Sequence, residues 1–112
     1  YLQAQQARQI LKRDFAKVFE KVDVLISPML PVLPPSIGDE TETDLGIFSS
    51  PANLTGLPAI SIPCGISKGL PVGMQIIGPA FKEEQVLNFA YAFERTNPLK
   101  NAKPSFTAAA VK

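Results

Sequence analysis

The chain has 112 residues, 46% of them hydrophobic and 19% charged, which fits one small globular domain and argues against disorder away from the ends. Its net charge of +1, with basic and acidic residues interspersed, excludes the electrostatic pattern of a nucleic-acid binder or of a protein held on an anionic membrane. No apolar run reaches the roughly 20 residues that span a bilayer. Histidine, the commonest general base and metal ligand, is absent, and we expect neither a metal nor a cofactor.

The single cysteine, Cys64, cannot form an internal disulfide, which favours a reducing compartment and a cytoplasmic location.

The first elements are predicted from periodicity and proline. Residues 1–21 place apolar side chains at three- and four-residue steps, which predicts a helix. Its apolar side, here called the helix stripe, consists of Ala7, Ile10, Leu11, Phe15, Val18, Phe19 and Val22. The β-branched run 22–27, closed by Pro28, is typical of a buried strand. Repeated prolines in 28–35 exclude a regular helix or a central strand, so we expect an extended segment there. The side chains expected to face inward are Met29, Leu30, Val32 and Leu33.

Residues 49–58 carry the signals of a short helix over 51–55. A hydroxyl N-cap at Ser49 or Ser50, followed by Pro51, marks the start of a helix, because proline at the first helical position has no N–H to leave unpaired. Gly56 is suited to the left-handed residue that ends such a helix.

The following residues predict a hairpin and a second long helix. Strands are predicted over 59–65 and 71–78 with a tight turn between them, which favours antiparallel pairing. Pro63 lies inside the first of these strands and has no N–H, so it must lie at a sheet edge or a bulge. Residues 82–95 have helical periodicity and an acidic first turn, which the helix dipole favours.

The order of these elements predicts an α/β fold: a small mixed sheet of about three strands, flanked by helices. Residues 1–96 form the domain segment in this prediction, and residues 97–112 a loosely ordered tail. So small a sheet has two open edges and is too narrow to cover the whole helix stripe. We therefore expect apolar surface to be left over for the rest of a parent protein or for self-association.

The candidate nucleophiles lack partners in the sequence. Ser49 and Ser50 have no neighbouring base and no G-x-S-x-G elbow, and capping explains both. Cys64 has no C-x-x-C partner and no histidine, and is interpreted as a small buried hydrophobe. Ser67 and Lys68 are turn neighbours whose side chains point apart. An acidic loop, interpreted as solvated because it lacks the order and the glycine of a calcium loop, contains Asp39, Glu40, Glu42 and Asp44. Taken alone, the residues indicate a packed segment without a catalytic constellation.

Three blocks, in chain order, resemble segments of the amidase signature family. They are FEKVDVLISPMLPVLPP (19–35), FSSPANLTGLPAISIPCG (48–65) and GLPVGMQIIGPAF (69–81). The resemblance extends over about residues 1–96 and is to the C-terminal quarter of such an enzyme. The chain also opens directly in helical pattern without an initiator methionine, so we expect a fragment of a longer protein.

The resemblance implies a many-stranded mixed sheet between helices, of which this chain supplies one end. It also implies cleavage of an amide C–N bond through an acyl-enzyme, by a serine, a second serine in a cis peptide, and a lysine. In the family these groups belong to earlier motifs, and neither motif occurs here. No catalytic residue is carried over, and we expect the chain alone to be inactive.

The resemblance further implies that the loop before the short helix contributes to the substrate pocket, with Asp44, Gly46 and Ile47 as the candidate substrate-binding positions. In the family's glutaminase branch, an aspartate five residues before the motif proline reads the substrate's amino group. Gly46 occupies that position here, and Asp44 could substitute only after a loop shift. This difference favours a general hydrolase of a small amide. The alternatives are the glutaminase branch, which serves tRNA-dependent amidotransferases, and a non-enzymatic binding or assembly module.

Overall fold

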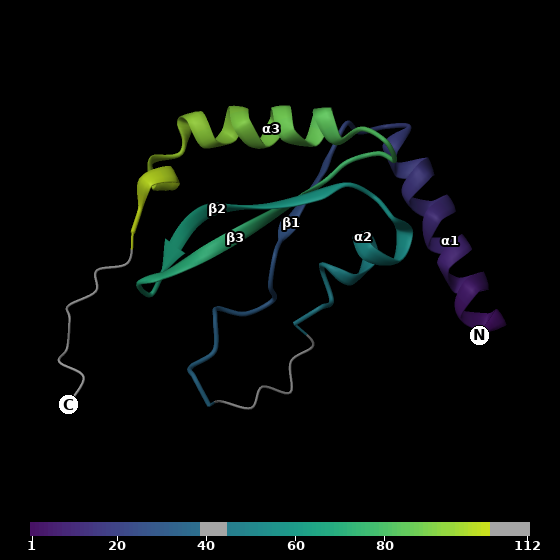
Figure 1. The fold of residues 1–112 in the computed structure, drawn as a ribbon, viewed down its shortest axis with the longest axis horizontal. Coiled ribbons are helices and arrows are strands. Elements are labelled where there is room, and N and C mark those ends of the chain that lie inside the picture. The colour runs from purple at the N-terminus through teal and green to yellow at the C-terminus, as the bar shows by residue number, and fades with distance from the viewer. Residues whose placement is uncertain (39–44, 104–112) are drawn as a thin grey trace.

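The computed structural model of the chain describes residues 1–38 and 45–103 and confirms an α/β fold. Its elements are α1 (Leu2–Phe19), β1 (Leu25–Pro28), α2 (Ser50–Thr55), β2 (Ala59–Ser67), β3 (Leu70–Ile77), α3 (Glu83–Thr96) and the 3-10 helix η1 (Pro98–Asn101). The strands form one three-stranded sheet in the order β1-β3-β2 (Figure 1). Both pairings are antiparallel, so within the described residues the sheet is not the predicted mixture of parallel and antiparallel strands.

The predicted β2–β3 hairpin is confirmed. Ser67 pairs with Leu70, which leaves Lys68 and Gly69 as a two-residue loop, and both have positive φ, 51° and 78°. Positive φ at both loop positions is what a type I′ turn requires. Pro63 was predicted to lie at a sheet edge or a bulge, and the structure shows both. Strand β2 is an edge strand, and its register shifts between Pro63 and Gly65.

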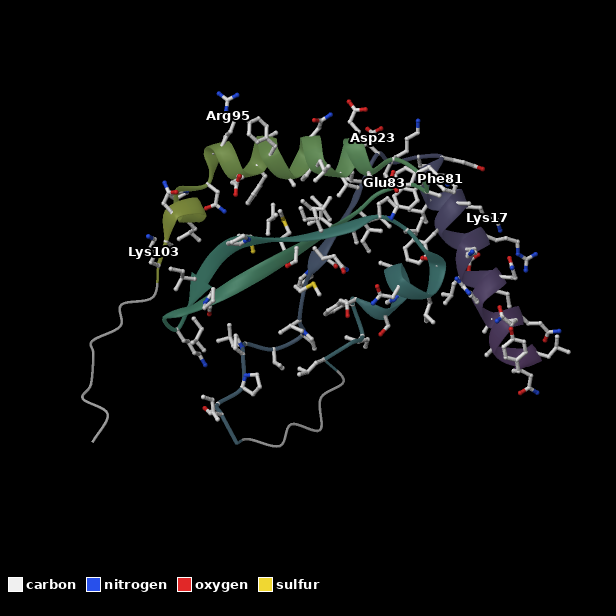
Figure 2. All side chains as sticks on the ribbon, viewed as in Figure 1. Lys17, Asp23, Phe81, Glu83, Arg95 and Lys103 are labelled. Atoms are coloured by element: carbon white, nitrogen blue, oxygen red, sulfur yellow. The ribbon has the colours of Figure 1, made fainter. Side chains whose placement is uncertain are left out.

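The hydrophobic core lies between the sheet and α3, which runs along one face of it (Figure 1). Ile76 of β3, with 0% of its surface exposed, packs against Val86 and Ala90 of α3. The partly buried side chains around this centre are Val24, Ile60, Ile62, Met74 and Phe89. Arg95 points from α3 away from the sheet, with its guanidinium carbon 5.9 Å from the centroid of the Tyr91 ring (Figure 2). One side of α3 is therefore packed on the sheet, and the other is exposed, with Leu87 and Tyr91 as well as Arg95 on it.

Gly78 brings the end of β3 close to the start of α3. A Cβ atom built on this glycine would lie 2.4 Å from Cγ2 of Val86. The Gly78 N–H also donates a hydrogen bond of 2.9 Å to the carbonyl oxygen of Pro58. Only a residue without a side chain fits here, because Val86 is buried and the backbone of Gly78 is held by this bond.

The short helix α2 confirms the predicted position but not the predicted cap. Ser49 is the N-cap residue, and Gly56 ends the helix in the left-handed conformation with φ 74°. The Ser49 hydroxyl makes no cap hydrogen bond and instead donates to the carbonyl oxygen of Gly46 at 3.4 Å. A capping side chain needs an extended backbone, whereas Ser49 has helical angles, φ −90° and ψ −31°.

Helix α1 differs most from its prediction. It extends from one end of the sheet, and its main packing contact is with α2, so of the α-helices in the described residues α3 is the one that covers the sheet (Figure 1). None of its residues is buried, and Ile10 of the helix stripe is 50% exposed. A stripe shows that a helix has an apolar side but not which surface meets it. The predicted surplus of apolar surface is present on the described residues.

Two smaller predictions near β1 were wrong. The strand begins at Leu25 rather than at residue 22, because Leu25 pairs with Ile77, the last residue of β3, and earlier residues have no strand to pair with. Val32, predicted to face inward, is 41% exposed. Its neighbours Met29, Leu30 and Leu33 are half-buried as predicted.

Residues 97–103 contact the sheet. The Asn97 side chain donates a hydrogen bond of 2.7 Å to the carbonyl oxygen of Pro63, and its Oδ1 accepts one of 2.9 Å from the Leu99 N–H. The predicted tail thus begins with a helical turn, η1, that contacts β2 and α3. Residues 104–112 lie outside the described part of the chain.

Candidate functional site

Two of the three predicted substrate-pocket positions, Gly46 and Ile47, belong to the segment 45–50, here called the pocket loop, which leads into α2. Its shape is set by the carbonyl oxygen of Gly46, which accepts hydrogen bonds from the N–H groups of Ser49 (3.1 Å) and Ser50 (2.8 Å). Ile47, at the outside of this bend, is 55% exposed. The structure therefore places Gly46 and Ile47 side by side on an accessible bend. The third predicted position, Asp44, lies outside the described residues.

The pocket loop is attached to the centre of the sheet by Gln75 of β3. The side-chain amide of Gln75 donates to the carbonyl oxygen of Phe48 at 2.8 Å and to the hydroxyl of Ser27 at 3.2 Å. Gln75 is only 3% exposed. A buried amide without partners would cost about 1–3 kcal/mol, and these two bonds use both of its N–H donors.

Gln75 lies in a polar row that crosses all three strands. Ser27 of β1 and Ser61 of β2 are its direct register partners. Successive side chains of a strand point to opposite faces, so this row lies on the face opposite Ile76 and α3. Gly73 lies two residues earlier on the same face, where an added Cβ would be 3.1 Å from the Ser61 hydroxyl. The row thus forms a narrow polar surface beneath the pocket loop.

Sequence reasoning missed Gln75. The available signal was a long polar side chain inside the apolar run VGMQIIG, in a strand that pairs on both sides. In the folded chain Gln75 is buried and bonded to the loop at Phe48, and a buried side-chain amide needs a specific partner.

The candidate nucleophiles have structural roles in the described part of the chain. The Ser49 hydroxyl donates to Gly46, and the thiol of Cys64, which is half-buried, donates to the carbonyl oxygen of Val72 at 3.5 Å. No hydrogen bond among residues 1–38 and 45–103 joins Ser49, Ser50 or Cys64 to a lysine or a carboxylate. A nucleophile needs such a base within hydrogen-bond reach. The described residues thus contain no assembled catalytic group.

The predicted turn pair Ser67 and Lys68 is exposed at the hairpin tip. The acidic residues Asp39, Glu40 and Glu42 lie outside the described residues, as Asp44 does. Among residues 1–38 and 45–103, no three His, Cys, Asp or Glu side chains gather as a metal site would require. Within the same residues, none of the helices has both the length and the apolar character to cross a membrane.

Comparison with known proteins shows which family shares this sequence and fold. Residues 1–87 match the sequence profile of the Amidase family. The chain belongs to the Amidase family. The match includes β1, the pocket loop and the hairpin that carries Gln75.

Relatives of this Amidase segment include the A subunit of the glutamyl-tRNA(Gln) amidotransferase of Thermoanaerobacter pseudethanolicus, which is 49% identical over 109 residues. That match covers 93% of this chain and 22% of the relative. The solved A subunit of the Thermotoga maritima amidotransferase aligns with a TM-score of 0.77 at 38% identity, over 83% of this chain and 22% of its own. A bacterial aryl acylamidase of the amidase signature family aligns with a TM-score of 0.69 at 30% identity, over 84% and 22%. The resemblance to amidase signature enzymes is confirmed, and the chain spans less than a quarter of the length of these relatives.

Proposed function

We propose that residues 1–96 of this chain are the C-terminal segment of an amide hydrolase, in which they carry the pocket loop while the serine, cis-serine and lysine groups lie on preceding polypeptide. The proposal rests on the contrast between the extent of the family match and the catalytic groups that the described residues lack. The family match runs through the pocket loop and the sheet beneath it, yet the described residues contain no nucleophile with a base. The chain itself is inactive in this proposal, and it works in the cytoplasm, which the unpaired thiol of Cys64 supports.

The proposed substrate is the side-chain amide of glutamine. Among the solved structures, the A subunit of the Thermotoga maritima amidotransferase is 38% identical to this chain and the aryl acylamidase is 30% identical, and curated relatives named as that subunit reach 44–49%. A second candidate, hydrolysis of a small amide other than glutamine, is favoured by Gly46, which stands where the resemblance places an aspartate in the glutaminase branch.

A segment exchange tests this function and separates the two substrates. In the Thermoanaerobacter pseudethanolicus relative, the 109 matched residues are replaced by this chain. We expect the resulting chimera to release ammonia from glutamine, and the isolated chain to release none from glutamine or from simple amides. A folded chimera that hydrolyses only other amides would establish the second candidate. Turnover by the isolated chain, or a folded chimera inactive on every amide, would overturn the proposal.

We further propose that the isolated chain self-associates through its uncovered apolar surface. Ile10 of the helix stripe and the outer edges of β1 and β2 are the supporting features. Light scattering over a wide concentration range is expected to show a mass above that of the monomer, and Ile10→Lys to lower it. Gln9→Lys, which adds the same charge at an exposed position outside the stripe, serves as the matched control. A strictly monomeric mass at all concentrations would refute self-association.

A further inference from the structure

We propose that Gln75 is a positioning residue for substrate binding: its buried amide holds the pocket loop in the one conformation that accepts the substrate. This inference rests on the proposed function, since it takes the pocket loop to line the substrate site. Gln75 touches neither substrate nor reacting atoms in this account. It acts through the main chain of Phe48.

The backbone of Gln75 is held rigidly in the sheet. It lies on β3, which is paired on both sides, and its neighbours in register are Ser27 and Ser61. The adjacent residue, Ile76, is fully buried against α3. A side chain that starts from such a backbone has little freedom, and the bond to Ser27 restricts its amide further.

The bond to Phe48 transfers this rigidity to the pocket loop. Phe48 is 27 residues away from Gln75 in the sequence, and its carbonyl oxygen accepts at 2.8 Å. The bonds from Ser49 and Ser50 to Gly46 shape the loop internally, whereas the Gln75 bond ties it to the sheet. Fixing the carbonyl of Phe48 restricts the two preceding residues, Gly46 and Ile47, which are the predicted pocket positions.

The fraction of time for which the pocket loop is anchored sets the apparent affinity for substrate. When a loop is competent for only a fraction of the time, the apparent dissociation constant rises by the inverse of that fraction. Losing the donor to this partly buried carbonyl lowers the equilibrium ratio of anchored to free loop about tenfold, and the apparent dissociation constant rises by as much once the free loop predominates. Substrate that does bind selects the anchored loop again, so the rate of the bound complex changes little.

The variant Gln75→Met tests the inference, because it keeps the length of the side chain and removes both N–H donors. Gln85→Met serves as the control, because it makes the same chemical change at a glutamine that bridges α3 to Asp23 with two bonds of 3.2 Å, away from the pocket loop.

The first measurement needs no activity: hydrogen exchange of the full chain. Gln75→Met is expected to accelerate exchange of the Ser49 and Ser50 amides about tenfold, with β3 itself unchanged, while Gln85→Met leaves these two amides as they are. The second measurement is steady-state kinetics with glutamine of the chimera described above. Gln75→Met is expected to raise KM by up to about tenfold and to change kcat by less than about twofold, and Gln85→Met to leave KM within about twofold.

The outcomes separate the two proposals. Unchanged exchange at Ser49 and Ser50 overturns the positioning role, whether or not the chimera is active. Accelerated exchange with an unchanged KM in an active chimera also overturns it, because the loop would then be anchored without consequence for binding. A drop in kcat alone overturns it as well. An inactive wild-type chimera counts against the proposed function instead, and the exchange measurement still decides whether Gln75 anchors the loop.

Discussion

Gly78→Ala is expected to destabilise the chain by about 2 kcal/mol, because the new methyl group has no room. Its Cβ would lie 2.4 Å from Cγ2 of Val86, far inside contact distance. Val86 cannot swing away, since it is β-branched on a helix and only 3% exposed. The strand cannot retreat without breaking the bond from the Gly78 N–H to Pro58. Urea unfolding followed by circular dichroism at one fixed protein concentration measures the loss.

A second substitution identifies the cause. Val86→Ala alone is expected to destabilise by about 2 kcal/mol through lost burial. In the double variant the removed methyl groups make room for the alanine, so the loss should fall short of the sum by about 1–2 kcal/mol. Gly65→Ala is the control, because an added Cβ there meets nothing within 4 Å. Strict additivity of Gly78→Ala and Val86→Ala would show that their contact is not the source of the effect.

Features that depend on neighbouring residues were predictable. The left-handed Gly56, the two-residue turn at Lys68 and Gly69, and the edge position of Pro63 each follow from a local steric rule. In each case a backbone preference decides the structure, and no distant part of the chain needs to be known.

Features that depend on residues distant in the sequence could not be predicted. The helix stripe predicted α1 but not its attachment beside α2, because an apolar side does not specify the surface that meets it. The hydroxyl of Ser49 was expected to cap α2, yet the pocket loop already bends into helical angles and turns it toward Gly46.

In the candidate site, too, the local segment was predicted and its long-range contact was not. The pocket loop was found by resemblance, and its accessible bend at Ile47 fits that prediction. Its attachment to the sheet was not foreseen, since Gln75 and Phe48 meet only when the hairpin folds over the loop. The substrate-binding roles of Asp44, Gly46 and Ile47 stay predictions.

Labelling with a serine-directed fluorophosphonate tests the central claim most directly, because this reagent reacts with an activated serine wherever it lies. Intact-mass measurement of the isolated chain is expected to show no adduct, since neither Ser49 nor Ser50 has a base among the described residues. The chimera is expected to gain one phosphonyl group, which peptide mapping places before the grafted segment. Stoichiometric labelling of Ser49, Ser50 or any other residue of this chain would contradict the account.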